Sequence, residues 1–244
     1  MKLFLMLDYD GTLAQIRRRP GEARLSLQRK KILQKLANNP KIKLAIISGR
    51  KLSDVKKMVG IPDIIYIGNH GFEIEFLGKM VIHPKALEFS KNLNRILENI
   101  KDSLGFLRGF EVEHKKYTAS LHYRGVPIYL QQRFVKKIKS IIMPYLKNKE
   151  AVVTYGKKVI ELRPPVKWNK GNAVLWILSR FKSKKVLPVY IGDDKTDEDA
   201  FKAIGNKGLT FYVGTTKPTS ARYKLKNVDE VYKLLKALSP SMPY

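Results

Sequence analysis

The chain contains no cysteine, and that absence excludes several kinds of chemistry. Disulfide bonds, a thiolate nucleophile and cysteine-ligated zinc all require this side chain. No stretch approaches the roughly 18 consecutive apolar residues that a membrane-spanning helix needs. The N-terminal residues enter a strand directly, which is not the pattern of a signal peptide. We therefore expect a cytoplasmic protein with no membrane association.

Acidic side chains are scarce: 21 Asp and Glu stand against 48 Lys and Arg, for a net charge of +27. Such a balance is common in nucleic-acid-binding proteins, and a non-catalytic protein of that kind is one alternative. Those proteins concentrate positive charge on one face or tail, whereas here it is spread almost evenly along the chain. We expect no nucleic-acid partner and interpret the charge as a solvated surface that attracts an anionic substrate.

Apolar runs and helical patterns alternate along the first and last parts of the chain. This alternation is typical of a parallel sheet covered by helices, and it predicts a doubly wound, Rossmann-like α/β core. We expect strands at residues 3–7, 43–47, 64–67, 72–76, 79–82, 186–191 and 209–213, and helices at 22–37, 51–59, 170–181, 196–204 and 228–238. Thr196 is expected to cap its helix.

The pattern changes in the middle of the chain. A long amphipathic helix containing Leu93 to Leu104 precedes strands near 110–113 and 117–123, and a second helix frays at Pro144. Strands at 152–155 and 159–162 end the block. We interpret residues 83–165 as a smaller α+β domain inserted into a core made of residues 1–82 and 166–244.

Two carboxylates, Asp8 and Asp10, follow the first apolar strand directly. Burying an unpaired carboxylate costs several kcal/mol, so chains avoid it unless a cation is present. A capped turn would explain the pattern, and so would an Mg²⁺ site in which one carboxylate is the nucleophile. Ser48 and Asp193 also follow strands, and the carboxyl ends of parallel strands meet at one edge where ligands bind.

These residues stand in four motifs that resemble those of the haloacid dehalogenase superfamily of phosphotransferases. The motifs are Asp8-Tyr-Asp10-Gly-Thr-Leu, Ser48-Gly-Arg50, Lys170 in Trp-Asn-Lys-Gly, and Gly192-Asp193-Asp194-Lys-Thr-Asp197. The resemblance implies a core of that superfamily with a cap domain, Mg²⁺ as the cofactor, and phosphoryl transfer through an aspartyl-phosphate. It assigns Asp8 as the nucleophile and Asp10 as the general acid and base.

Shorter pieces resemble the trehalose-6-phosphate phosphatase family: Gly68-Asn-His-Gly71, Glu113-x-Lys115, His122-Tyr-Arg124 and Glu161-Leu-Arg-Pro164. This resemblance implies hydrolysis of trehalose 6-phosphate to trehalose and phosphate. A phosphatase acting on sucrose 6-phosphate or a mannosyl-3-phosphoglycerate remains an alternative. The partner expected is a small sugar phosphate. The sequence leaves the oligomeric state open and is compatible with a monomer.

The two resemblances together imply a set of site residues. Catalysis is expected from Asp8, Asp10 and Lys170, metal binding from Asp8, Asp10 (through its backbone carbonyl) and Asp193, and support from Thr12, Asp194 and Asp197. Substrate contacts are expected from Ser48, Gly49, Arg50, Asn69, His70, Glu113, Lys115, Arg124, Lys157 and Glu161. Arg50 could equally begin a helix. The even spacing of Glu113 and Lys115, and of Lys157 and Glu161, predicts one strand face, which could instead be laced with ion pairs.

Overall fold

A computed structural model of the chain describes residues 2–17, 20–181, 186–215 and 218–239. It divides into two compact units. The core unit comprises Met1–Val81 and Trp168–Tyr244, and the inserted unit comprises Ile82–Lys167. No helix in the described part of the chain is long and apolar enough to cross a membrane.

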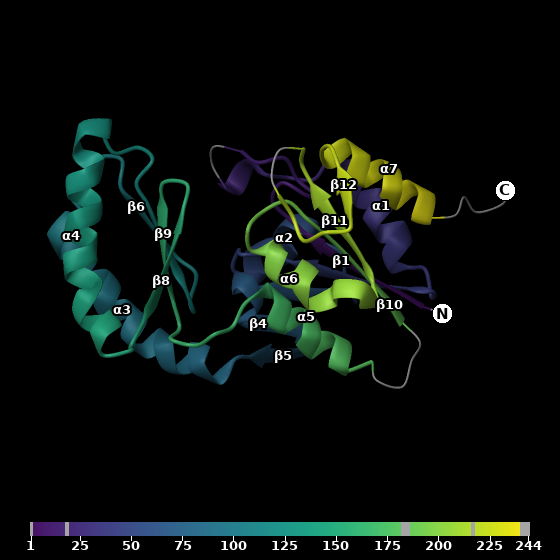
Figure 1. Ribbon diagram of the computed structural model, residues 1–244, viewed down its shortest axis with the longest axis horizontal. Coiled ribbons are helices and arrows are strands. Elements are labelled where there is room, and N and C mark those ends of the chain that lie inside the picture. Colours follow the sequence, from purple (N-terminus) through teal and green to yellow (C-terminus); the bar gives the residue numbers. More distant parts are fainter. Residues whose placement is uncertain (1, 18–19, 182–185, 216–217, 240–244) are drawn as a thin grey trace. The chain divides into compact units, whose positions relative to one another are not determined.

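An eight-stranded sheet forms the centre of the core unit, with the strand order β12-β11-β10-β1-β2-β3-β4-β5 (Figure 1). β1, β2, β3, β10, β11 and β12 run parallel, and β4 is antiparallel to β3. The strands are β1 (Lys2–Asp8), β2 (Ile42–Ile47), β3 (Ile65–Gly68), β4 (Glu73–Phe76), β5 (Lys79–Ile82), β10 (Val186–Gly192), β11 (Leu209–Val213) and β12 (Tyr223–Leu225).

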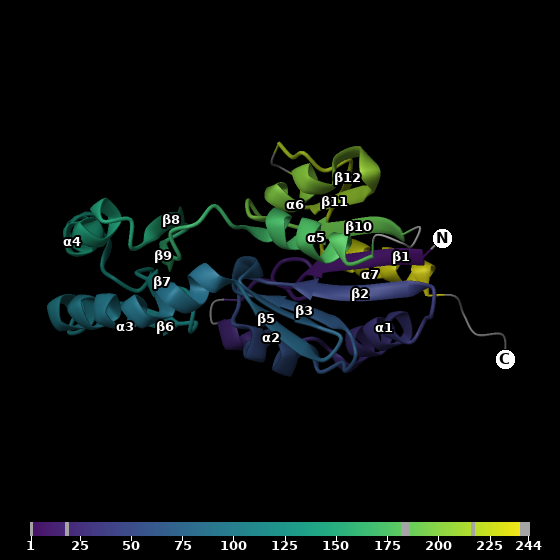
Figure 2. The ribbon, with the colours of Figure 1, turned by 90° about the horizontal axis from the view of Figure 1, so that it is seen from below.

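Helices cover both faces of this sheet (Figure 2). One face carries α1 (Leu27–Ala37), α2 (Leu52–Val59) and α7 (Val228–Leu238), and the other carries α5 (Lys170–Ser179) and α6 (Asp197–Ile204). Successive residues of β1 enter opposite cores, because strand side chains alternate between faces: Leu5 and Leu7 face the first set of helices, and Phe4 and Met6 the second. This burial on both faces explains the continuous apolar run.

The strand register brings the predicted site residues to one edge. Asp8 at the end of β1 pairs with Ile47, and the preceding Leu7 pairs with Ile191. Ser48 and Asp193 therefore follow the ends of the two strands that flank β1. The chain leaves β1 and β10 in opposite directions across the sheet, so this edge is a topological switch point, where open α/β sheets bind ligands.

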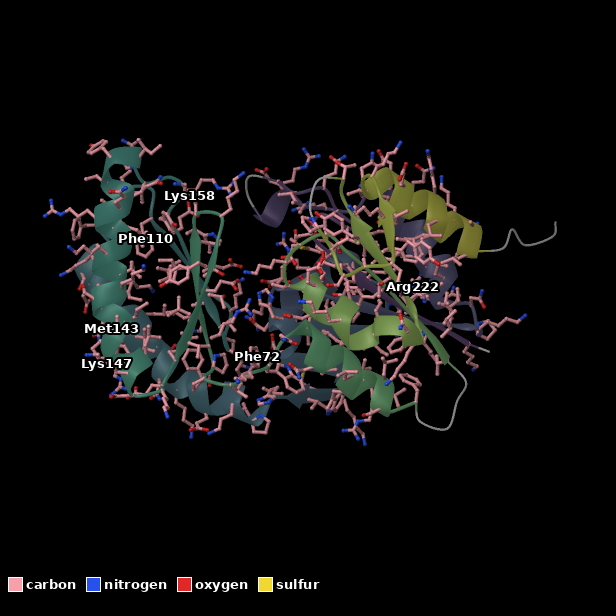
Figure 3. The ribbon with its side chains drawn as sticks, in the orientation of Figure 1. Phe72, Phe110, Met143, Lys147, Lys158 and Arg222 are labelled. Carbon is pink, nitrogen blue, oxygen red and sulfur yellow. The ribbon has the colours of Figure 1, made fainter. Side chains whose placement is uncertain are left out.

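The inserted unit contains a four-stranded sheet in the order β6-β7-β9-β8, with helices packed on one face. Its elements are α3 (Pro84–Leu104), β6 (Glu111–His114), β7 (Ala119–His122), α4 (Ile128–Lys147), β8 (Val152–Gly156) and β9 (Val159–Arg163). Leu121, Ile160 and Leu162 pack toward the helices. Phe110, labelled in Figure 3, lies against Phe134 of α4 with ring centroids 4.9 Å apart. The opposite face is polar.

Most predicted elements are confirmed, with three differences. The first helix begins at Leu27 rather than residue 22, since the Ser26 side chain accepts a hydrogen bond from the Arg29 amide and caps it there. α4 continues through Pro144 to Lys147 instead of fraying, although proline removes one helical hydrogen bond, and its buried residues Phe134, Ile138 and Ile142 pack in the core of the inserted unit. The short strand β12 was not predicted. Short 3₁₀ helices lie at Pro20–Glu22, Asn69–Gly71 and Gly205–Lys207.

The prediction that Thr196 caps α6 is wrong. Its side chain makes no capping hydrogen bond, and its hydroxyl donates instead to Asp194 Oδ1 at 2.7 Å. Asp194 Oδ1 also accepts from the backbone amides of Thr196, at 2.7 Å, and Asp197, at 3.2 Å. Asp194 therefore satisfies the first amides of the helix, where a negative charge is favoured.

Candidate active site

Lys170 joins two aspartates at the carboxyl edge of the sheet. It begins α5, and its ammonium donates hydrogen bonds to Asp8 Oδ1 and Asp197 Oδ1, each at 2.7 Å. All three side chains are almost fully buried, Lys170 with 2% of its side chain exposed. Burial lowers the pKa of Lys170, but the charges of Asp197 and Asp8 outweigh this effect and raise it well above its usual value. The lysine is thus a fixed cation.

Asp197 orients this lysine, and its own position is fixed on every side. Its Oδ1 also accepts a hydrogen bond from the Tyr190 hydroxyl at 2.7 Å. Its Oδ2 accepts from the backbone amides of Asp193 at 3.1 Å and Asp194 at 3.0 Å. Because both oxygens are occupied, Asp197 is placed to hold the loop after β10 and Lys170 together rather than to react.

Asp193 lies against the loop after β1. Gly11 has φ +85°, and a Cβ atom there would overlap the Asp193 carboxylate. This close approach explains why the loop carries glycine at that position. Two buried oxygens, Asp193 Oδ1 and Thr12 Oγ1, have no hydrogen-bond partner among the residues that the structure describes. Unsatisfied buried oxygens at one edge are the mark of a site built for a ligand or ion.

The acidic cluster fits a divalent cation. Carboxylate oxygens from Asp8, Asp193 and Asp197 lie within 4.8 Å of one another. Burial and the neighbouring carboxylates Asp197 and Asp194 raise the pKa of Asp193 from 3.8 to about 8. Burial likewise raises the pKa of Asp8, against the attraction of Lys170. A cation between Asp8 and Asp193 would relieve this repulsion, and oxygen ligands of this kind suit Mg²⁺.

Asp10 is turned toward Arg50. The guanidinium donates two hydrogen bonds to the carboxylate, from Nε to Oδ2 and from Nη2 to Oδ1, each at 2.6 Å. The Arg50 side chain is 12% exposed and also lies over the Tyr9 ring, 5.6 Å from its centroid. The structure thus places Arg50 on the predicted general acid rather than at the start of α2, which begins at Leu52.

Ser48 and His70 lie beside each other through a tight turn after β3. The Ser48 hydroxyl accepts a hydrogen bond from the Arg50 amide at 3.1 Å, which leaves its own proton available to a phosphate. His70 packs on Gly49 so closely that a Cβ atom there would overlap the imidazole. Asn69 and His70 both adopt positive φ, 48° and 56°. For residues other than glycine this costs about 1–3 kcal/mol each, and such strain concentrates at functional sites.

The open face of the inserted unit carries a connected set of charged side chains. Lys115 Nζ lies 3.7 Å from Glu113 Oε2 and 3.7 Å from Glu161 Oε1. Arg163 pairs with Glu161 Oε2 at 2.5 Å, and His122 contacts Glu113 at 2.9 Å. Glu113 on β6 and Glu161 on β9 thus share Lys115, and their two strands flank β7 on either side. Lys115 joins them from just beyond β6.

Lys157 does not lie on that strand face, contrary to the prediction. Residues 157–158 form the turn between β8 and β9, and Lys158 (Figure 3) has φ 63° there. The alternation of side chains applies only within a strand, so it does not reach Lys157. Arg124 lies in another turn, and its Nη2 donates to the Lys157 carbonyl at 3.4 Å. These two exposed residues are thus neighbours at one end of the sheet.

The sequence analysis assigned no role to three side chains of these clusters: Tyr190, Arg163 and His122, the last of which it quoted only as part of a motif. Tyr190 stands in an apolar strand, and nothing in the sequence distinguishes it from a core tyrosine. Arg163 is two residues from Glu161 on the same strand, so the spacing used for the other residues could have found it.

The core sheet, the carboxylates at its switch point and the separate antiparallel sheet define the haloacid dehalogenase-like fold with an inserted cap. A family model described as trehalose-phosphatase matches residues 6–229. The chain belongs to this family of phosphatases.

Individual relatives agree with this assignment. The chain is 32% identical over 252 residues to trehalose-phosphate phosphatase B of Arabidopsis thaliana, spanning 97% of this chain and 66% of that one. A solved trehalose-6-phosphate phosphatase related protein superposes with a TM-score of 0.84 at 26% identity, covering 97% and 96% of the two chains. The C-terminal domain of C. albicans trehalose-6-phosphate phosphatase gives 0.81, also at 26%, covering 98% and 92%.

Proposed function

We propose that this chain hydrolyses trehalose 6-phosphate to trehalose and phosphate, with Mg²⁺ as cofactor and an aspartyl-phosphate on Asp8. The observation that carries the proposal is the buried Lys170 between Asp8 and Asp197, beside Asp193 Oδ1, which has no hydrogen-bond partner in the described part of the chain. A phosphate monoester is a dianion, so an anionic nucleophile reaches phosphorus only where cations and donors cancel that charge. Lys170 supplies a positive charge in direct contact with the nucleophile, Asp8.

The chemistry proceeds in two displacements. A carboxylate oxygen of Asp8 attacks phosphorus, and the bond from phosphorus to the sugar oxygen breaks as Asp10 gives that oxygen a proton. Asp10 then takes a proton from a water molecule, which attacks the aspartyl-phosphate and releases inorganic phosphate. The Ser48 hydroxyl donates to a phosphate oxygen through both steps.

Arg50 must release Asp10 for the first step. A guanidinium holds a carboxylate in its charged form, whereas a general acid needs its proton. The incoming phosphate is the natural competitor for the two Arg50 donors, because it matches their fork as well as a carboxylate does. We infer that Arg50 moves from Asp10 to the phosphate on substrate binding, which frees Asp10 to face the leaving oxygen.

Mg²⁺ would be held by Asp8, Asp193 and the backbone carbonyl of Asp10. The support is the orphaned Asp193 oxygen and the crowding of carboxylates that raises its pKa. Bound there, the cation would neutralise charge on the phosphate oxygens. Asp194 and Asp197 act indirectly, through α6 and Lys170, and Thr12 keeps a buried hydroxyl directed at the site.

The inserted unit is proposed to act as the cap that recognises the sugar, with residues 83–165 as the cap and residues 1–82 and 166–244 as the catalytic domain. Glu113, Lys115 and Glu161 offer charged donors and acceptors on one sheet face, as the hydroxyls of a disaccharide require. The exposed Arg124 and Lys157 would reach the substrate from the turns at one end of that sheet.

The test is phosphate release over a panel of trehalose 6-phosphate, sucrose 6-phosphate, mannosyl-3-phosphoglycerate and glucose 6-phosphate. We expect the highest kcat/KM on trehalose 6-phosphate, with dependence on Mg²⁺. Preference for another member of the panel would overturn the substrate and leave the reaction intact. No release from any member would overturn the reaction as well.

A further inference from the structure

The turn after β3 is held in place by its backbone. Asn69, His70 and Gly71 all have positive φ, the last at 105°. The Asn69 amide donates to the Arg50 carbonyl at 2.7 Å and the His70 amide to the Ser48 carbonyl at 3.0 Å. The turn therefore runs along the predicted phosphate-binding segment and fixes its shape.

Glu73 connects this turn to α2. It lies on β4 with 6% of its surface exposed, and its Oε2 accepts hydrogen bonds from the Leu52 amide, at 3.1 Å, and from the Asn69 side chain. Lys51, the residue before the helix, makes no side-chain capping bond, so Glu73 serves the first amide of α2 from another strand. One buried carboxylate oxygen thus accepts hydrogen bonds from Leu52, which follows the Ser48–Arg50 segment in sequence, and from Asn69, which contacts that segment through its backbone.

These hydrogen bonds together fix the position of His70 in the turn. Its ring lies against Gly49 and its charge acts on the fourth motif. Burial alone would raise the pKa of Asp194, but Lys170, hydrogen bonds involving Thr196 and Asp197, and the charge of His70 together lower it below its usual range. His70 therefore lies against the Ser48-Gly49-Arg50 motif, and its charge also acts on Asp194 of the fourth motif.

We propose that Glu73 is a positioning residue for the phosphatase reaction, which locks the strained Asn69-His70 turn so that His70 and Gly49 present their donors to the substrate phosphate. This inference rests on the proposed function. The strain in the turn is what requires a lock, since without one Asn69 and His70 would relax to ordinary φ and withdraw the imidazole. Displacement of a substrate-positioning group by about 1 Å can cost roughly 100-fold in rate.

Three substitutions on one strand separate positioning from simple packing. Glu73→Ala removes both hydrogen bonds and should lower kcat/KM about 10- to 100-fold on trehalose 6-phosphate and on an aryl phosphate alike. Glu73→Gln keeps an acceptor oxygen and should restore most of the rate. Glu75→Ala is the matched control: Glu75 also pairs with α2, through Lys56 at 2.6 Å, and makes no side-chain hydrogen bond to Asn69 or His70 among the described residues. It should keep the wild-type rate.

A double-mutant cycle shows whether Glu73 acts through His70. We expect Glu73→Ala to add little to the loss caused by His70→Ala, with both rates corrected for the folded fraction. Additive losses, or a wild-type rate in folded Glu73→Ala, would overturn the inference. If Glu73→Ala does not fold, Asn69→Ala decides, because it keeps the helix bond, removes the link to Glu73 and leaves a non-glycine residue at the positive φ that requires the lock. A wild-type rate there would also overturn the inference. A wild-type enzyme inactive on both esters would overturn the proposed function instead.

Discussion

Lys170 Nζ and Asp8 Oδ1 lie 2.7 Å apart, although 162 positions separate the two residues in the chain. The parallel register makes this contact possible, since β1 and β10 lie side by side and α5 leads into β10. The same ammonium reaches Asp197, so one cation holds the start of α5, the end of β1 and the start of α6. Lys170 therefore ties three elements together at the site where we propose that phosphate binds.

Lys170→Met should lose both activity and stability. Breaking a buried ion pair by removing one partner typically costs about 3–5 kcal/mol, and we expect a loss of that order in chemical denaturation. Turnover should fall at least about 100-fold, as for other groups that stabilise transition-state charge. Lys202→Met, on the exposed side of α6, is the control and should change neither quantity. A near-normal rate in Lys170→Met would contradict the assigned role.

Asp193→Asn should stabilise the metal-free protein while abolishing its response to Mg²⁺. The pKa of Asp193 is raised from 3.8 to about 8 by burial and neighbouring carboxylates. Its favourable contribution is therefore present below the unfolded value and lost as pH rises through about 8. The gain in thermal midpoint should be larger near pH 8.5 than near pH 6, with each 1 kcal/mol worth about 2–4 °C.

The measurement is thermal unfolding in chelator and in excess Mg²⁺ at both pH values. Wild type should gain stability from Mg²⁺ because binding to the folded state shifts the equilibrium, and the variant should gain little. A variant less stable than wild type in chelator would show that the carboxylates do not repel one another.

Gly11→Ala tests the close approach of the first and fourth motifs. A methyl group there would overlap the Asp193 carboxylate, and φ +85° is unfavourable for alanine by roughly 1–2 kcal/mol. We expect reduced stability and weakened Mg²⁺ affinity in a titration of activity. Gly21→Ala is the control, since nothing lies within 4 Å of its added Cβ. Equal behaviour of the two variants would argue against the contact.

The sheet was predictable because each central strand is buried on both faces and reads as an apolar run. β12 was missed because Tyr223–Leu225 is short, lies at the sheet edge and carries a lysine in its middle. Two local details could not be predicted from composition, because they depend on local geometry. One is that α4 continues past Pro144, and the other is that Asp194 rather than Thr196 caps α6.

The site was predictable in part because the strands that carry it could be predicted. The carboxyl ends of parallel strands lie at the same edge of a sheet. Asp8, Ser48 and Asp193 could therefore be placed at one edge before their contacts were known. The pairing of Arg50 with Asp10 depends on side-chain rotamers, and the role of Glu73 depends on a left-handed turn. Neither leaves a trace in spacing.

Glu161→Ala should separate recognition of the sugar from chemistry at phosphorus. Loss of a charged hydrogen bond costs roughly 1.5–3 kcal/mol, so kcat/KM on trehalose 6-phosphate should fall about 10- to 200-fold. The rate on a small aryl phosphate should persist, because that ester does not need the sugar contacts. Part of the loss could appear in kcat if sugar binding helps to exclude water.

Glu150→Ala serves as the control for this substitution. Glu150 also belongs to the inserted unit and pairs with Arg95 at 2.9 Å, away from the Lys115 cluster. Its loss should leave both rates unchanged. Equal losses on the two substrates in Glu161→Ala would mean that Glu161 only holds the sheet together, and an unchanged trehalose 6-phosphate rate would mean that this face does not read the sugar.

The nucleophile is the centre of the account, and Asp8→Asn tests it most directly. The measurement is phosphate release from trehalose 6-phosphate in saturating Mg²⁺, with circular dichroism to verify the fold and Asp10→Asn as the companion variant. We predict no detectable turnover for Asp8→Asn, and for Asp10→Asn a rate reduced by about 10²–10⁴, the usual value of general acid–base catalysis. Wild-type turnover by a folded Asp8→Asn protein would contradict the mechanism.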